Sequence, residues 1–351
     1  MSRVVFVTQQ VDPVHPTLGA ASAMVRALAE RVDEVVVLAA AADIESLPGN
    51  ARFLGFSAPT QALRGGRFEA ALAGTLLRGR PTALLAHMSP IYAVLAAPLL
   101  RPLRVPLLLW FTQQRAGRSL RRAERVVDAI LSVDRRAVPL ASPKVRAIGH
   151  GIDTVEFACV EPGPRDGRLR LLSLGRYTEV KGHDVVLRAL QRLVAEGLDA
   201  QLTVHGEEAT ANDAVVRRRL GELAAELGLG ARARLLDALP RPQVPALLAE
   251  TDVLVNATHG PTADKVVFEA AACCVPAVAA SPVFEALLPA ALRFRDGDEA
   301  SLAAAVRTAA DIPSETRREL RRRVEASHSV GHWADAVLAA AATSRRALSR
   351  G

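Results

Sequence analysis

Short apolar segments alternate with segments of helical periodicity along almost the whole of this chain. The first half contains predicted strands at residues 4–8, 35–38, 83–85 and 105–111, and predicted helices at residues 21–29, 90–100 and 119–128. The second half contains predicted strands at residues 169–174, 201–204, 234–236, 253–255 and 276–279, and predicted helices at residues 186–194, 213–227, 243–249 and 266–273. Strands that alternate with helices build a parallel sheet covered by helices on both faces. We therefore predict an α/β fold made of two such units in tandem.

A segment rich in proline and glycine separates the two halves. Residues 161–167 read EPGPRDG, a composition typical of an exposed linker. A chain of 351 residues, half of them hydrophobic, is long enough for two domains with separate cores. We place the domains at residues 1–158 and 159–332, and expect residues 333–351 to form a helix that packs back toward the first domain. Because ligands of parallel sheets bind at the carboxyl ends of the strands, we expect the functional site in a cleft between the domains.

The charge of the chain is strongly one-sided. Its 44 basic side chains, of which three are lysines, give a formal net charge of +7. This charge favours an anionic partner, although the same composition fits a genome-wide preference for arginine codons. No nucleic-acid-binding motif accompanies the charge, so we predict no nucleic-acid partner.

The cysteines and the apolar segments bear on the compartment. Cys159, Cys273 and Cys274 are odd in number and two are adjacent, so they offer neither a disulfide framework nor a CxxC metal site. We expect no disulfide and a reducing cytoplasm. The amino terminus lacks the pattern of a signal peptide. Residues 83–100 are uncharged, but their prolines favour a strand followed by a buried helix over a transmembrane segment.

Two of the three lysines lie where a predicted strand gives way to a predicted helix. Residues 175–182 read GRYTEVKG, which places Arg176 and Lys181 beside the amino terminus of a helix. The partial positive charge of such a terminus favours an anion, and the segment suits a diphosphate. A turn whose charges are solvated is the alternative.

The second segment, residues 264–269, reads DKVVFE and again joins a strand to a helix. We expect Lys265 and the first backbone N–H groups of the helix to face the cleft. Glu269 lies one turn later on the same face. Its carboxylate is suited to accept hydrogen bonds from two ribose hydroxyls, and the alternative is an ordinary first-turn acid stabilised by the helix dipole.

The order and spacing of these motifs resemble a family of glycosyltransferases. In the second half, GRYTEVKG is followed by HG at 205–206, LP at 239–240, DVLVN at 252–256 and EA at 269–270, before Pro276. In the first half stand TQQVDP at 8–13, HMSPIY at 87–92, WFT at 110–112 and IGHGID at 148–153. Together they look like a family 4 glycosyltransferase of the GT-B fold, in which two Rossmann-like domains face each other across a cleft. The resemblance covers nearly the whole chain.

The resemblance implies a retaining transfer of a sugar from a nucleoside diphosphate sugar, without a metal or other cofactor. By this similarity Arg176 and Lys181 would neutralise the charge that develops on the leaving diphosphate. Glu269 would hold the ribose. The donor-binding residues on the second domain would be Gly175, Gly206, Lys265, Val266 and Glu269.

The first domain would be the acceptor side. His87 would approach the sugar at the end of its strand, whereas an isolated histidine of this kind would suggest a hydrogen-bonded core residue. The acceptor would lie near Leu18, Gly19 and Gln113. Its class, whether a glycan, a lipid-linked sugar or a small metabolite, is left open by these motifs.

The loop before Lys265 departs from the family pattern. Pro261 stands where most relatives carry a glutamate that contacts the donor sugar. A subset of the family carries an Asp-Lys pair in this loop instead, as Asp264 and Lys265 do. We therefore expect Asp264 to be the sugar-facing carboxylate, with His259 as the second candidate.

Two further departures keep other functions open. Gln113 replaces a histidine that many relatives carry, and Cys274 replaces a glycine. A catalytically silent GT-B scaffold that binds a nucleotide, or a sugar-nucleotide epimerase, are the alternatives to a transferase. The absence of a GxGxxG motif after any predicted strand disfavours a nicotinamide oxidoreductase.

Two further charged segments allow more than one interpretation. DGD at 296–298 imitates the metal-binding DxD of a different transferase fold, but it precedes a predicted helix and suits an N-cap. Arginines crowd the helix at residues 115–125: Arg115, Arg118, Arg121, Arg122 and Arg125. They would dock an anionic acceptor or a membrane surface, or form a solvated face. We expect the protein in the cytoplasm, with the inner face of the cell membrane as the alternative.

Overall fold

The computed structural model describes residues 2–114, 116–160 and 167–350, which form two compact units. The first unit comprises Met1–Asp153 and Ser327–Gly351, and the second comprises Thr154–Ala326. The boundary between the units lies between residues 153 and 154, five residues before the boundary after residue 158 that we predicted from the sequence. Most of the predicted linker, residues 161–166, lies outside the described residues.

The first unit is built on a parallel sheet with the strand order β5-β3-β1-β6-β7-β8-β9. Its strands are β1 (Arg3–Val7), β3 (Glu34–Ala39), β5 (Ala51–Gly55), β6 (Ala83–His87), β7 (Leu107–Trp110), β8 (Ala129–Ser132) and β9 (Val145–Ala147). A separate parallel pair joins β2 (Gln10–Val11) to β4 (Ala41–Ala42).

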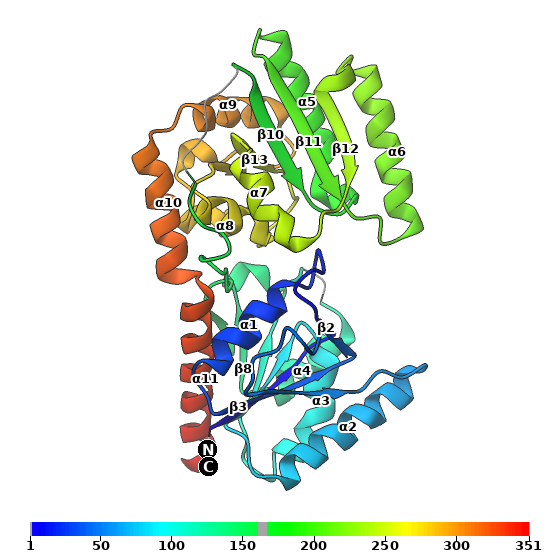
Figure 1. Ribbon diagram of the computed structural model, residues 1–351, viewed down its shortest axis with the longest axis vertical. Helices are drawn as coiled ribbons and strands as arrows, with labels where there is room; N and C mark the ends of the chain where they lie inside the picture. The colour runs from blue at the N-terminus through cyan, green and yellow to red at the C-terminus, as the bar shows by residue number, and fades with distance from the viewer. Residues whose placement is uncertain (1, 115, 161–166, 351) are drawn as a thin grey trace. The chain divides into compact units, whose positions relative to one another are not determined.

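Helices cover both faces of this sheet, and they bury the residues of its central strands (Figure 1). They are α1 (Ala20–Ala29), α2 (Gln61–Leu77), α3 (Pro90–Leu100), α4 (Arg118–Val126) and α11 (Val330–Arg350), with a short 3₁₀ turn, η1 (Arg135–Ala137). One core joins alternate strand residues such as Val5 and Leu84 to α2, α3 and α4. The terminal helix α11 packs against α1 and β8.

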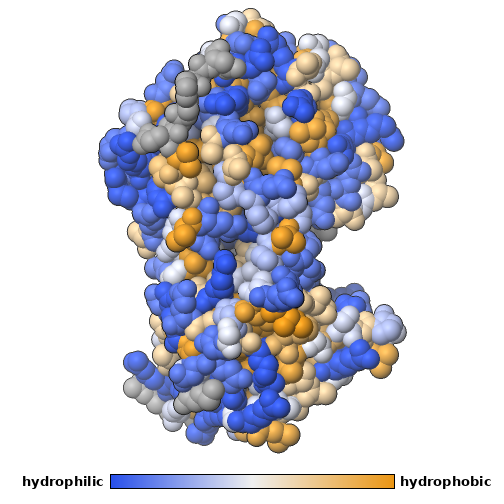
Figure 2. Space-filling view, in the orientation of Figure 1, coloured by the Kyte–Doolittle hydropathy of each residue, from blue (hydrophilic) through white to orange (hydrophobic). Residues whose placement is uncertain are grey.

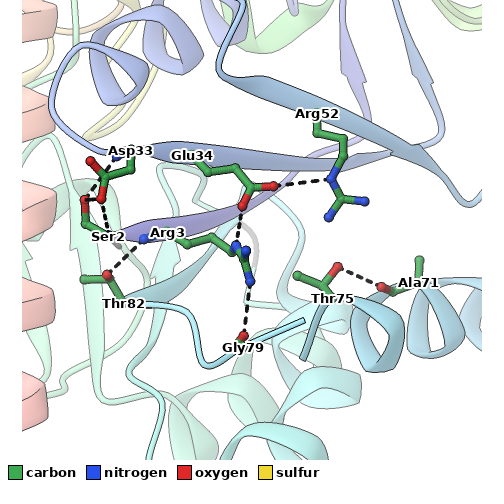
Figure 3. A network of polar contacts seen from close by, with 9 residues as sticks. All are labelled: Ser2, Arg3, Asp33, Glu34, Arg52, Ala71, Thr75, Gly79 and Thr82. Carbon is green, nitrogen blue, oxygen red and sulfur yellow. Dashed lines mark hydrogen bonds and ion pairs between the residues drawn. The ribbon is translucent and has the colours of Figure 1, made fainter. Parts of the chain in front are cut away.

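Charged groups tie the amino ends of four strands together (Figure 3). Arg3 Nε donates to Glu34 Oε2 at 2.5 Å, and Arg52 Nε donates to Glu34 Oε1 at 3.3 Å. The Arg3 backbone N–H donates to Thr82 Oγ1 at 3.2 Å. These contacts link β1, β3, β5 and the start of β6 at the edge opposite the carboxyl ends, where ligands of parallel sheets bind.

The second unit has a parallel sheet with the strand order β12-β11-β10-β13-β14. Its strands are β10 (Leu169–Leu174), β11 (Ala200–Gly206), β12 (Ala233–Asp237), β13 (Val253–Asn256) and β14 (Ala277–Ala279). Its helices are α5 (His183–Ala195), α6 (Ala211–Glu226), α7 (Val244–Ala249), α8 (Lys265–Ala272), α9 (Glu299–Ala310) and α10 (Ser314–Ser327). Its 3₁₀ turns are η2 (Glu179–Lys181), η3 (Gly230–Arg232), η4 (Arg241–Gln243), η5 (Pro282–Ala286) and η6 (Ala290–Leu292).

These elements confirm the predicted α/β fold with parallel sheets. Residues 83–100 form β6 and α3, as the sequence predicted. The sequence did not predict several strands and helices: β2, β4, β5, β8, β9, α2 and α10. Helix α2 contains Gly65, Gly66 and Gly74, which lower its helix propensity and hid its periodicity. Strand β5 lies at the edge of the sheet and is only half-buried, so its apolar signal is weak.

The expectation of no disulfide is wrong. Cys159 and Cys274 form a disulfide across a sequence separation of 115 residues, and Cys273 is a buried free thiol. The sequence did not reveal this pairing, because Cys274 stands next to Cys273 while its disulfide partner lies 115 residues away. We expected a reducing compartment because the sequence pattern of the cysteines offered no disulfide, and the observed disulfide removes this reason.

The described helices do not include one long and apolar enough to cross a membrane. Figure 2 shows hydrophilic and hydrophobic residues interspersed over the visible surface. The arginine helix is α4, on which Arg118, Arg121, Arg122 and Arg125 are exposed. Arg115 lies outside the described residues. Contact of α4 with a membrane stays a prediction.

The disulfide predicts a thiol count. Iodoacetamide applied to the denatured, unreduced protein should label Cys273 alone, and after reduction it should label all three cysteines, as read from intact mass. The Cys159→Ser variant is the control, because its two remaining thiols should both react without a reductant. Three labels on the unreduced wild-type protein would contradict the pairing.

Candidate functional site

The two predicted basic segments meet at one point of the second sheet. Strand β10 lies between β11 and β13, and the chain runs from β10 to β11 on one side and returns to β13 on the other. Such a reversal of strand order opens a crevice at the carboxyl ends of the two central strands, where ligands of open α/β sheets bind. Residues 175–182 follow β10, and residues 257–264 follow β13 (Figure 1).

An ion pair joins these two loops. Lys181 Nζ donates to Asp264 Oδ2 at 2.6 Å. The same oxygen accepts from Asn256 Nδ2 at 2.8 Å and from Thr258 Oγ1 at 2.5 Å. Burial raises the pKa of Asp264, but the Lys181 ammonium and these two donors outweigh it and hold the pKa at about 2. Asp264 is therefore a fixed carboxylate at neutral pH.

Glycines let the loops approach closely. Gly182 has a φ of 61°, and a Cβ there would collide with the Ala257 carbonyl, so the β10 and β13 loops touch through backbone. A Cβ on Gly206 would lie 2.6 Å from the Gly175 carbonyl oxygen and 2.8 Å from the Tyr177 ring. Gly175 and Gly206 thus pack closely together at the carboxyl ends of β10 and β11.

Arg176 is held by a partner that the sequence did not predict. Its Nη2 donates to Asp213 Oδ2 at 2.8 Å, from the first turn of α6. Burial raises the pKa of Asp213, but hydrogen bonds from Thr210 and Arg176 lower it overall. The ion pair with Asp213 fixes the orientation of the Arg176 side chain, which remains accessible because it is 42% exposed.

The second basic segment opens helix α8. Asp264 is its N-cap residue and Lys265 its first residue, followed by Val266. Burial lowers the pKa of Lys265 to about 8, against the opposing effect of the Glu269 carboxylate. A half-buried ammonium beside a helix amino terminus is suited to neutralise an anion.

Glu269 is buried in an ion pair. Arg241 Nη1 donates to Glu269 Oε1 at 2.8 Å, and Arg241 Nη2 lies 3.5 Å from Glu156 Oε2. Arg241 and Glu156 are charged site residues that sequence reasoning missed. Arg241 directly follows the LP motif at residues 239–240, which was the available signal.

His87 ends β6 in the first unit. The ring is buried, its Nδ1 lies 3.1 Å from Thr8 Oγ1, and it stacks on Phe6 with ring centroids 5.4 Å apart. Met88, the next residue, has a φ of 55°, a left-handed conformation that costs energy for a residue with a side chain. The strained turn fixes His87 at the carboxyl edge of the sheet.

The predicted acceptor-side residues lie at the same edge of the first sheet. Leu18 donates its backbone N–H to His15 Nδ1 at 3.1 Å, and Gly19 is the N-cap of α1. Gln113 is exposed in the loop that follows β7. Strand β6 therefore contributes His87 at its carboxyl end, the segment between β2 and α1 contributes Leu18 and Gly19, and the loop after β7 contributes Gln113.

The DGD motif is used structurally. Asp298 Oδ1 accepts from the Ser301 N–H at 2.9 Å and caps α9, as predicted. Asp296 lies 2.5 Å from His259 Nδ1 and accepts from the Gly260 N–H at 3.1 Å. His259, the second candidate for a sugar-facing group, is thus directed at Asp296. Within the described parts of the chain, no three His, Cys, Asp or Glu side chains gather as ligands for a metal ion.

Comparisons with known proteins cover the second unit most specifically. Residues 168–311 match the model of a family described as glycosyl transferases group 1. The D-inositol 3-phosphate glycosyltransferase of Thermobispora bispora is 34% identical over 121 residues. That match covers 34% of this chain and spans 28% of the length of the relative.

Solved structures resemble the chain over nearly its whole length. A glycosyltransferase from Rickettsia africae ESF-5 superposes with a TM-score of 0.76 at 12% identity, covering 98% of both chains. Sucrose-phosphate synthase from Thermosynechococcus elongatus superposes with a TM-score of 0.76 at 17% identity, covering 100% of both chains. Identities this low show the fold alone. The chain has the GT-B fold, and residues 168–311 are similar to the glycosyl transferases group 1.

Proposed function

We propose that this protein is a glycosyltransferase that moves a sugar from a nucleoside diphosphate sugar to an acceptor hydroxyl, with retention of configuration. The observation that carries the proposal is the ion pair of Lys181 with Asp264, which joins the loops after β10 and β13 next to Lys265, the first residue of α8. The match of residues 168–311 to the glycosyl transferases group 1 supports the class of reaction.

Cations at the crevice would stabilise the leaving group. When the bond between the sugar and the diphosphate breaks, negative charge builds up on the diphosphate oxygen. Arg176 and Lys181 would neutralise that charge in place of a metal ion, and Lys265 with the amino terminus of α8 would bind the same group. Because Asp213 already orients Arg176, little reorganisation of that guanidinium is needed.

Carboxylates would orient the donor. Asp264 would face the sugar, as an Asp-Lys pair does in the subset of family 4 that the sequence resembles. The diphosphate would compete with Asp264 for Lys181, while Asn256 and Thr258 keep Asp264 in place. Glu269 would accept from the ribose hydroxyls. His87, Leu18, Gly19 and Gln113 would serve the sugar and the acceptor.

The donor and acceptor can be screened directly. The nucleoside diphosphate that raises the melting temperature most identifies the donor nucleotide, because a ligand that binds only the native state stabilises it. Acceptors to test first are inositol phosphates and sugar phosphates, since the names of the similar proteins include D-inositol 3-phosphate glycosyltransferase and sucrose-phosphate synthase. Binding without transfer would favour a silent scaffold, and conversion of the donor without an acceptor would favour an epimerase.

Two lysines give a matched pair of variants. Lys181→Ala should lower the transfer rate by about 10²–10³-fold, because it removes a cation from the leaving group. Lys144 Nζ instead donates to the carbonyls of Glu124 at 2.7 Å and Val127 at 2.8 Å, at the end of α4. Lys144→Ala should lower the melting temperature and leave the rate per folded molecule unchanged. Full activity in a folded Lys181→Ala protein would disprove the role of Lys181.

The pKa of Lys265 predicts a pH dependence of donor binding. The ammonium is charged below pH 8 and becomes neutral as the pH rises through about 8, so the affinity for a nucleoside diphosphate should fall between pH 7 and pH 9.5. In the folded protein the pKa of Lys265 lies below its ordinary value of 10.5, so its ammonium lowers the stability of the fold. This destabilisation diminishes as the pH rises from 8, because the folded protein then loses the proton before the unfolded chain does. The titration of Lys265 itself therefore does not destabilise the fold over the range in which the affinity falls.

Isothermal titration at several pH values measures this dependence. Lys265→Arg is the control, since a guanidinium stays charged over this range and should flatten the curve. A wild-type affinity that is constant up to pH 9.5 would show that the charge of Lys265 does not serve the diphosphate.

A further inference from the structure

Two ion pairs of Arg241, one buried and one partly exposed, lie behind the carboxylate proposed to hold the ribose. The Arg241 guanidinium donates to Glu269 at 2.8 Å and lies 3.5 Å from the Glu156 carboxylate. The side chains of Arg241 and Glu269 are 4% and 3% exposed. The guanidinium also lies over the Phe157 ring, 4.9 Å from its centroid.

Burial makes these partners depend on one another. A buried guanidinium needs carboxylates that compensate for its lost hydration, and removing one partner leaves an uncompensated charge. Glu156 and Phe157 thus hold Arg241 from one side, and Arg241 fixes the position of Glu269 from the other. The orientation of Glu269 depends on a segment that does not belong to its own helix.

That segment, residues 154–160, has no helix or strand to keep it in place. Arg321 of α10 donates to the carbonyls of Thr154 at 3.1 Å and Phe157 at 3.0 Å. The covalent anchor is the disulfide from Cys159 to Cys274, two residues after α8 ends at Ala272. The disulfide fastens the segment that carries Glu156 to the helix that carries Glu269.

We propose that Arg241 and Glu156 are positioning residues for the donor site, and that the Cys159–Cys274 disulfide sustains donor affinity by holding Glu156 against Arg241. This inference rests on the proposed function, in which Glu269 binds the donor ribose. It adds that the affinity of the site for the donor responds to the oxidation state of the two cysteines.

Cys274 is suited to this task by its backbone. Its φ of 60° is a left-handed conformation that glycine adopts most easily, so a cysteine there is strained, and the disulfide gives its side chain a use that a glycine could not supply. The neighbouring Cys273 is buried, and burial raises the pKa of its thiol to about 12. Cys273 therefore has almost no thiolate with which to exchange into the disulfide.

The test is the dissociation constant of the nucleoside diphosphate identified by thermal shift, measured by titration calorimetry, together with KM and kcat. Dithiothreitol reduces the disulfide to two thiols: the reagent supplies the two electrons and two protons and is itself oxidised to a cyclic disulfide. Reduced wild-type protein, Cys159→Ser, Cys274→Gly and Glu156→Gln should each bind about three- to thirtyfold more weakly. KM for the donor should rise with kcat nearly unchanged.

Three controls separate positioning from a general structural role. Dithiothreitol should not affect Cys159→Ser, which has no disulfide to lose. Glu285→Gln removes a pair with Arg293 that is more exposed, and should bind normally. The double variant Glu156→Gln with Cys159→Ser should bind no more weakly than Glu156→Gln alone, because both changes act through one route.

The outcomes are distinguishable. If oxidised wild-type protein binds no nucleoside diphosphate, the proposed function fails. If it binds, and if reduction and Glu156→Gln leave the dissociation constant unchanged, the positioning role is overturned. Glu156→Gln is isosteric and keeps the disulfide, so it decides the question alone should the cysteine variants unfold.

Discussion

The ion pair between Lys181 and Asp264 is the contact on which the site in the second unit depends. It joins the loop after β10 to the loop after β13, and these loops meet because the two strands are neighbours in the sheet. With no ligand bound, each charge compensates the other, so neither is left without a partner in a partly buried position. A diphosphate would have to compete with a carboxylate that Asn256 and Thr258 hold firmly, which favours a ligand of high charge.

The other charges of the site follow the same arrangement. Arg176 is oriented by Asp213, and Glu269 by Arg241, so both of these charged groups have a partner from a different element. Groups fixed in this way stabilise a developing charge without reorganising, which is the main source of electrostatic catalysis. The backbone contributes as well, since Gly182 allows a contact between the loops that any side chain would prevent.

The sequence could predict what depends on local pattern. Alternating strands and helices indicated two parallel α/β units, and the strand-to-helix junctions at Lys181 and Lys265 lie at one edge of one sheet. Partners distant along the chain could not be predicted: Asp213 for Arg176, Arg241 for Glu269, and Cys159 for Cys274. Their pairing depends on how helices and loops pack in three dimensions, and the spacing between them has no characteristic period. Helix α2 was missed for a local reason, because its glycines obscure the helical pattern.

A crystal structure of the protein with the nucleoside diphosphate that stabilises it most would test the proposed donor site directly. The diphosphate should lie in the crevice between β10 and β13, within hydrogen-bond distance of Lys181 Nζ and the amino terminus of α8, with the ribose at Glu269. A diphosphate bound elsewhere, with the crevice empty and the pair of Lys181 and Asp264 unchanged, would contradict it.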